Sequence, residues 1–151
     1  MQPQIPRTII ALDVGSKRVG VAVASLIARL PRPLTTLDRE RDFFAELEKL
    51  INDEAAGAIV IGFPRGMQGQ STDQTAATED FVVDLKQHVS LPIVFQDEAL
   101  TSKNAEAELE ARGANYSKAD VDALAATYIL EYFLSEHDLT GDLRAPRADT
   151  G

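Results

Sequence analysis

The chain has 151 residues, of which 44% are hydrophobic, and a formal net charge of −9 at pH 7. This length suits one domain with a proper core, and the absence of cysteine excludes a disulfide framework, a thiolate zinc site and a cysteine nucleophile. The acidic charge argues against a protein that simply coats nucleic-acid phosphates. We see no apolar run long enough to span a bilayer and no secretory signal, so we expect a cytoplasmic protein without membrane contact.

The first part of the chain predicts several strands and one helix. Residues 8–13 are a short, isoleucine-rich run ended by a Gly-Ser turn, which indicates a buried strand. Residues 18–24 alternate valine with small residues and follow closely enough to complete a β-hairpin. A shorter third strand is expected at 34–37, a helix at 41–54 from the spacing of its apolar positions, and another buried strand at 58–62.

The next part predicts helices that alternate with a strand. Residues 63–72 contain proline and glycines and predict a loop. A helix is expected at 73–88 and a strand at 92–96. A helix that starts near Thr101 and Ser102 is expected to end at Gly113.

The last helix carries recognisable end signals. Ser117 is expected to cap it, and Asp120 three residues later completes a pattern like a capping box. The helix is expected to run to about Glu136. We therefore predict one domain over residues 1–137 and a disordered tail over 138–151.

This order of elements predicts an α/β domain with a mixed sheet. An antiparallel hairpin lies beside parallel strands that are joined by crossover helices, and helices flank the sheet. Sites in such sheets form at the carboxyl ends of the parallel strands. Asp13 and Glu98 are expected at two such ends.

Asp122 is a third carboxylate in an unexpected place. Helical spacing puts it on the same apolar face as Ala125, Ala126, Ile129 and Phe133. Burying an unpaired carboxylate is expensive, so a fold that gathers three of them usually supplies a cation. Hard oxygen ligands select Mg²⁺ or Mn²⁺, and such sites commonly act on phosphate esters.

Each carboxylate also has a purely structural explanation. Asp13 suits a tight turn, Glu98 suits an exposed strand end, and Asp122 in a first helical turn is stabilised by the helix dipole. Only their combination favours a metal-dependent nuclease over these alternatives.

Basic and polar residues surround the three carboxylates. Lys17 and Arg18 follow Asp13, Arg29 and Arg32 come further on, Lys103 follows Glu98, and Lys118 precedes Asp122, so we expect these six cations near the site. The glycine-rich loop between a strand and a helix offers backbone amides to a phosphate, although it lacks the Gly-Lys-Ser/Thr ending of a P-loop. The expected substrate-binding residues are Lys17, Arg18, Gly62, Pro64, Gly69, Thr101, Ser102, Lys103 and Lys118.

Four segments carry motifs of one known family, in the order and at the spacing of that family. They are Leu12–Val23, Ile61–Pro64 with Met67–Gly69, Asp97–Ser102 and Val121–Ala126. Together they resemble the YqgF/RuvX family, which has the RNase H-like fold of the Holliday junction resolvase RuvC. The resemblance extends from about Thr8 to Phe133. It implies an RNase H-like sheet and makes Asp13, Glu98 and Asp122 the catalytic, metal-binding carboxylates.

Members of this family are described as pre-16S rRNA nucleases or as junction resolvases. The resemblance therefore implies an endonuclease that hydrolyses structured RNA with two Mg²⁺ or Mn²⁺ ions, in the processing of the 5′ end of pre-16S rRNA. The alternatives are a resolvase of four-way DNA junctions and a non-catalytic module that binds nucleic acid. The expected oligomeric state is a monomer or a homodimer. A phosphotransferase related to actin-like ATPases needs two such domains, for which this chain is too short.

Two positions depart from the family pattern. Ala99 stands where the family usually has an arginine after the glutamate, and Ala24-Ser25 replaces a Ser-Asp pair at the end of the second strand. Alanine cannot bind phosphate or balance charge. We hypothesise that Arg18 or Lys103 takes the place of the missing arginine.

Overall fold

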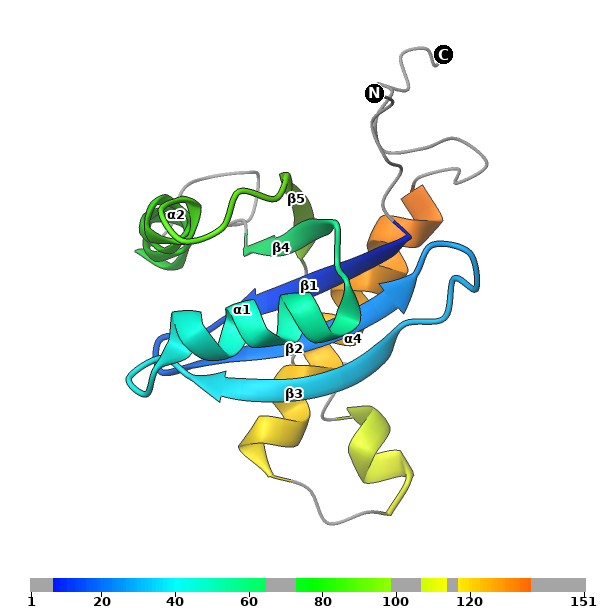
Figure 1. The fold of residues 1–151 in the computed structure, drawn as a ribbon. Coiled ribbons are helices and arrows are strands. Elements are labelled where there is room, and N and C mark those ends of the chain that lie inside the picture. The colour runs from blue at the N-terminus through cyan, green and yellow to red at the C-terminus, as the bar shows by residue number, and fades with distance from the viewer. Residues whose placement is uncertain (1–6, 65–72, 99–106, 114–116, 137–151) are drawn as a thin grey trace.

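The computed structural model describes residues 7–64, 73–98, 107–113 and 117–136 (Figure 1). The elements follow the predicted order, and most boundaries differ from the expected ones by one or two residues. They are β1 (Thr8–Val14), β2 (Arg18–Ser25), β3 (Arg32–Asp38), α1 (Phe43–Glu54), β4 (Ala58–Pro64), α2 (Asp73–Lys86), β5 (Ile93–Glu98) and α4 (Lys118–Glu136). Residues 107–111 are also helical, and Gly113 beyond them has the positive φ of 69° expected at a helix end.

The five strands form one mixed sheet in the order β3-β2-β1-β4-β5. β1 pairs with β2 and β2 with β3 in antiparallel fashion, whereas β1 pairs with β4 and β4 with β5 in parallel. The predicted mixed α/β sheet is therefore confirmed. β3 is an edge strand, where Pro33 is tolerated beside a register shift between Val21 and Ala22.

The helices cover both faces of the sheet (Figure 1), and strand alternation assigns each residue of β1 to one face. Ile10 and Leu12 pack in the cluster that contains α1 and α2. Ile9 and Ala11 pack in the cluster that contains α4. All four are fully buried, and the same alternation puts Asp13 on the α4 face.

The position of α4 is fixed at both of its ends. The backbone N–H of Ser117 donates to Asp120 Oδ2 over 3.0 Å, and that of Asp120 donates to Ser117 Oγ over 3.2 Å, so the predicted capping box is confirmed. Thr36 Oγ1 in β3 donates to the carbonyl of Ala119 over 2.7 Å. At the other end, Arg29 Nη2 donates to the carbonyl of Leu134 over 2.9 Å.

Arg29 and Arg32 do not lie where the sequence predicted. The antiparallel β2 carries the chain back to the amino end of β1, since Ser25 pairs with Thr8. Both arginines come after Ser25 in the chain and lie at that end. Arg29 binds the end of α4, and Arg32 forms an ion pair with Glu54 at 3.4 Å. The prediction that they gather near Asp13 is wrong, because they lie at the opposite end of the sheet.

Within the described residues, no helix is both long and apolar enough to cross a bilayer.

Replacing the capping hydroxyl should weaken α4. We expect Ser117→Ala to lower the free energy of unfolding by about 1 kcal/mol, because the backbone N–H of Asp120 loses its acceptor at the helix start. Urea unfolding at pH 7 measures this change. Ser135→Ala, in the last turn of the same helix, is the matched control and should stay within about 0.5 kcal/mol of the parent. Equal losses in both variants would contradict a capping role.

Candidate active site

Gly20 is the point at which β1, β2 and α4 meet. It pairs with Asp13 across the hairpin. A Cβ atom added to Gly20 would collide with the carbonyl group of Asp122, so the first turns of α4 rest directly on the backbone of β2. Only glycine permits this approach. The structure thereby brings Asp13 and Asp122 together around one glycine, on the same face of the sheet.

Arg18 joins this group from the same strand. Its Nε atom donates to Asp122 Oδ2 over 3.1 Å, and the side chains of Arg18 and Asp122 are 36% and 19% exposed. Arg18 lies two residues before Gly20, so alternation puts both on the α4 face. The ion pair orients the Asp122 carboxylate while part of the guanidinium still reaches solvent.

Glu98 is the last residue of β5 and pairs in register with Pro64. Gly62 pairs with Gln96 two residues earlier, and Leu12 pairs with Ile61 on the other side of β4. The backbones of Asp13 and Glu98 therefore lie at the same carboxyl edge of the sheet, with β4 between them. The side chain of Glu98 is outside the described part of the molecule.

Some of the other predicted substrate-binding residues lie in the described part of the chain, and the rest lie outside it. Lys17 is exposed in the hairpin turn, and Lys118 is exposed at the first position of α4. Gly62 and Pro64 lie at the end of β4. Gly69, Thr101, Ser102 and Lys103 are outside the described residues, as is Ala99.

The donor set suits a hard divalent cation. Asp13 and Asp122 contribute carboxylate oxygens from two different elements, which is the ligand chemistry of Mg²⁺ and Mn²⁺. No three His, Asp or Glu side chains of the described segments gather closely enough to hold an ion. A third carboxylate from the end of β5 would complete such a set.

Arg39, which the sequence did not single out, supports the turn behind Asp13. Its Nη1 atom donates to the carbonyl of Gly15 over 2.7 Å, and its backbone N–H donates to the carbonyl of Lys17 over 2.9 Å. Its guanidinium also lies 5.1 Å from the centre of the Phe81 ring in α2. Arg39 thus links the β1–β2 turn to the opposite face of the sheet. No local sequence pattern marks this role.

A second group of titratable residues lies on the outer side of α4. Tyr128 donates its hydroxyl to Glu108, which also pairs with Arg112. Burial, together with the hydrogen bond to Glu108, raises the pKa of Tyr128, and burial followed by the nearby charge of Glu108 raises the pKa of Glu131. These contacts fasten the helical residues 107–111 to α4, which gives the group a structural role.

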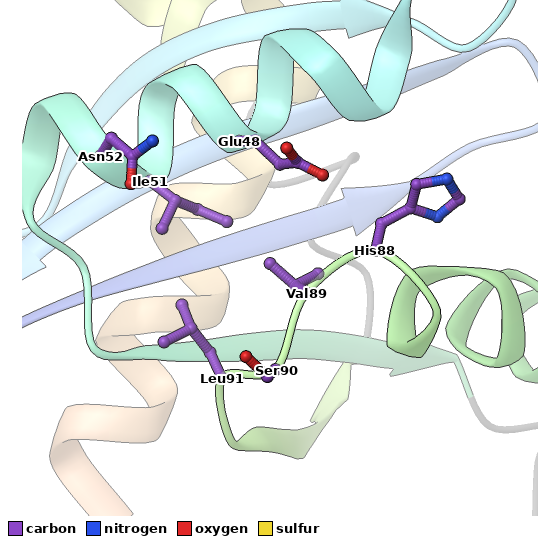
Figure 2. A pocket seen from close by; sticks show the side chains of 7 residues that line it. All are labelled: Glu48, Ile51, Asn52, His88, Val89, Ser90 and Leu91. Carbon is purple, nitrogen blue, oxygen red and sulfur yellow. The ribbon is translucent and has the colours of Figure 1, made fainter.

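A surface pocket lies away from the carboxylates. Figure 2 shows it between α1 and the segment that follows α2, lined by Glu48, Ile51, Asn52, His88, Val89, Ser90 and Leu91. Ile51, Val89 and Leu91 belong to the cluster on the α1 face. The sheet therefore separates this pocket from Asp13 and Asp122, and it is not part of the candidate site.

Comparison with known proteins agrees with this geometry. A family model described as RuvX, Holliday junction resolvase, matches residues 7–136. A protein of Pseudomonas putida named "Putative pre-16S rRNA nuclease" is 37% identical over 133 residues, which cover 85% of this chain and 94% of that protein. A protein of Sulfurihydrogenibium with the same name is 34% identical over 128 residues, covering 83% of this chain and 88% of that protein.

Two solved structures share the fold at low sequence identity. T. thermophilus RuvC in complex with a Holliday junction substrate has a TM-score of 0.52 and 14% identity, and the match covers 85% of this chain and 95% of RuvC. The Fowlpox virus resolvase in complex with Holliday junction DNA has a TM-score of 0.52 and 9% identity, covering 87% of this chain and 99% of the resolvase. The predicted RNase H-like fold is confirmed.

The contact at Gly20 gives a test of the site's architecture. We expect Gly20→Ala to lower the free energy of unfolding by about 1–3 kcal/mol, because the new methyl group collides with the backbone of α4. The shift of α4 should also weaken Mn²⁺ binding in isothermal titration calorimetry.

Gly113→Ala is the control for this variant. An added Cβ there meets nothing within 4 Å, although the positive φ makes alanine unfavourable by roughly 1 kcal/mol. It should therefore lose some stability but keep its Mn²⁺ affinity. Unchanged Mn²⁺ affinity in a folded Gly20→Ala protein would show that this contact does not define the metal site.

Proposed function

The chain belongs to the RuvX family, and from this premise we propose that it is a divalent-metal-dependent endonuclease that cuts structured RNA during processing of the 5′ end of pre-16S rRNA. Family and relatives together make it a nuclease, a hydrolase of phosphodiester bonds. The observation that best supports the metal-dependent site is the meeting of Asp13 and Asp122 at Gly20.

In this proposal Asp13, Asp122 and Glu98 hold Mg²⁺ or Mn²⁺ at the carboxyl edge of the sheet. A bound divalent ion supplies Lewis-acid stabilisation of the charge that develops on the phosphoryl oxygens. Asp13 lies at the end of β1, the central strand of the sheet, so it would be the central ligand of the set. Asp122 comes from α4, which packs against β2 on the face of the sheet that carries Asp13.

Arg18 orients both the site and the substrate. Its Nε atom engages Asp122, which leaves the outer guanidinium nitrogens as donors for a phosphate at the scissile bond. In this proposal Arg18 takes the place of the arginine that the resemblance predicts at the position of Ala99. Lys17 and Lys118 extend the positive surface on either side, and the proposed polar contacts of Gly62, Pro64, Gly69, Thr101, Ser102 and Lys103 complete the substrate path.

Resolution of four-way DNA junctions is the second candidate activity, because the matching family model carries that description. Such an enzyme would act as a symmetric dimer, since the junction presents two equivalent strands. A non-catalytic module is the third candidate, because Ala99 removes a cation from the acidic motif.

Removing the Asp13 charge should abolish cleavage. We expect Asp13→Asn to slow the reaction about a thousandfold, since an ion at this position contributes several kcal/mol to transition-state stabilisation. The assay compares a structured pre-rRNA fragment with a four-way DNA junction, each with Mn²⁺. Asp53→Asn, which removes an exposed carboxylate from α1 on the other face, is the matched control and should cut normally.

The substrates that are cut distinguish the three candidates. Cleavage of RNA alone supports the proposed function, and symmetric cleavage of the junction replaces it with the resolvase. If the wild-type protein binds Mn²⁺ and cuts neither substrate, it is a binding module. An Asp13→Asn protein that cuts at the normal rate would remove Asp13 from the mechanism.

Removing the Arg18 guanidinium should weaken both substrate binding and cleavage. We expect Arg18→Ala to lower substrate affinity about tenfold or more, because a charge-assisted hydrogen bond to phosphate contributes about 1.5–3 kcal/mol. Arg18→Lys should recover only part of this, because lysine lacks the planar fork of arginine. Electrophoretic mobility shifts and cleavage rates measure both effects.

Arg32→Ala is the matched control, since it removes an arginine that also pairs with a carboxylate but lies at the far end of the sheet. Lys103→Ala tests the other candidate for the missing arginine. If neither Arg18→Ala nor Lys103→Ala weakens binding or cleavage, then neither residue takes the place of the missing family arginine.

A further inference from the structure

Phe63 and Phe95 form an aromatic pair across the neighbouring strands β4 and β5. Their ring centroids lie 5.2 Å apart with an interplanar angle of 69°, an edge-to-face arrangement. Ile61 is the direct partner of Phe95, so Phe63 is its diagonal neighbour on the adjacent strand. Phe63 is half-buried, and Phe95 is 47% exposed.

This exposure contrasts with the rest of the same face. Ile59 and Ile61 precede Phe63 in β4 and are fully buried beneath the cluster that contains α1 and α2. β5 is the edge strand of the sheet, where exposed apolar side chains favour unwanted pairing. A half-exposed phenyl ring at such an edge offers an apolar contact to a partner outside the fold.

The aromatic pair and the proposed catalytic residues Asp13 and Glu98 lie on neighbouring strands of the sheet. Phe63 stands between Gly62 and Pro64, and Phe95 comes three residues before Glu98. β4 is also the direct neighbour of β1, about 4.8 Å away, so Phe63 is one strand from the end of the strand that carries Asp13. Asp13 faces α4 and Phe63 faces the other side, so the two positions flank one edge of the sheet.

We propose that Phe63 and Phe95 form a stacking site for an unpaired base of the nucleic-acid substrate, on the face of the sheet opposite Asp13. This inference rests on the proposed nuclease function and specifies a single-stranded stretch in the substrate. The strand passes round the carboxyl edge of the sheet, from Asp13 on one face to Phe95 on the other. Paired bases within a duplex have no free face for this contact.

Stacking suits the charge of this chain. With a net charge of −9, long-range attraction to phosphates gives only a small share of the affinity. Contact between a base and an aromatic ring requires no cation and tolerates any sequence, because every base has a π face. The aromatic pair therefore provides binding that changes little with salt. A second copy of the chain on the β5 edge is the competing occupant, and the nuclease family of the chain favours the nucleic acid.

The chain contains no tryptophan, so Phe95→Trp introduces a single fluorescent reporter at the proposed contact. It is combined with Asp13→Asn and studied without divalent metal, so that binding proceeds without cleavage. We expect an eight-nucleotide single-stranded RNA to quench the emission by about half or more, and a blunt duplex of the same sequence to leave it unchanged. Ile27→Trp is the matched control, because Ile27 is 73% exposed at the opposite end of the sheet and should not be quenched.

Affinity measurements with labelled RNA complete the test. Phe95→Leu keeps an apolar side chain and should bind single-stranded RNA about tenfold more weakly, whereas Phe95→Tyr should bind normally. Unchanged emission from the Phe95→Trp protein when it is saturated with RNA would overturn the proposal. So would a spectrum that shifts to the blue with protein concentration alone, because a second copy would then cover the introduced indole ring.

The same variants separate this inference from the proposed nuclease activity. Normal cleavage by Phe95→Leu, together with unquenched emission from Phe95→Trp, would overturn the stacking site and leave the nuclease intact. Quenching by RNA with no cleavage by the wild-type protein would support the stacking site and reject the catalytic proposal.

Discussion

The close approach of α4 to β2 at Gly20 is the constraint on which the site depends. Contact between a helix backbone and a strand backbone requires that no side chain stand between them, and Gly20 meets that condition. Alanines continue the contact along the interface: Ala22, Ala24, Ala58 and Ala126 all belong to the cluster under α4. Because α4 lies this close to the sheet, a carboxylate in its first turns can face one at the end of β1.

The two faces of the sheet differ in the size of their side chains. One face packs against α1 and α2, and the other carries the candidate site. The face under α1 and α2 contains large side chains, with Phe43 and Phe81 packed edge-to-face at 5.6 Å. These rings lie between the two helices and the strands. The face under α4 contains mainly small residues and ends at Asp13. Arg39 connects the two, since it binds the turn after Asp13 while lying against Phe81.

Local patterns in the sequence predicted the elements and the placement of two candidate site residues. The isoleucine run of β1 and the capping box of α4 are each contained within a few residues, so single-sequence reasoning found both. Helical periodicity also placed Asp122 on the buried face, with Ala125 and Phe133 fully buried as expected. Long-range geometry was harder to predict. The return of β2 carried Arg29 away from Asp13, and the roles of Gly20 and Arg39 depend on contacts between segments distant in the chain. A glycine isolated among valines was an available sign of close backbone approach.

Arg18 shows how a fold can supply from one element a charge that is missing from another. The resemblance to the family predicts an arginine next to the glutamate of the acidic motif, and here that position is Ala99. Arg18 comes from β2 and contacts Asp122, so its positive charge offsets that of the carboxylate. Under the proposed function, Asp13 and Asp122 would hold a divalent ion that supplies further positive charge, and the partly exposed guanidinium of Arg18 would bind a phosphate. The pairing of β2 with β1 supports this role, because it holds the backbone of Arg18 near the end of the strand that carries Asp13.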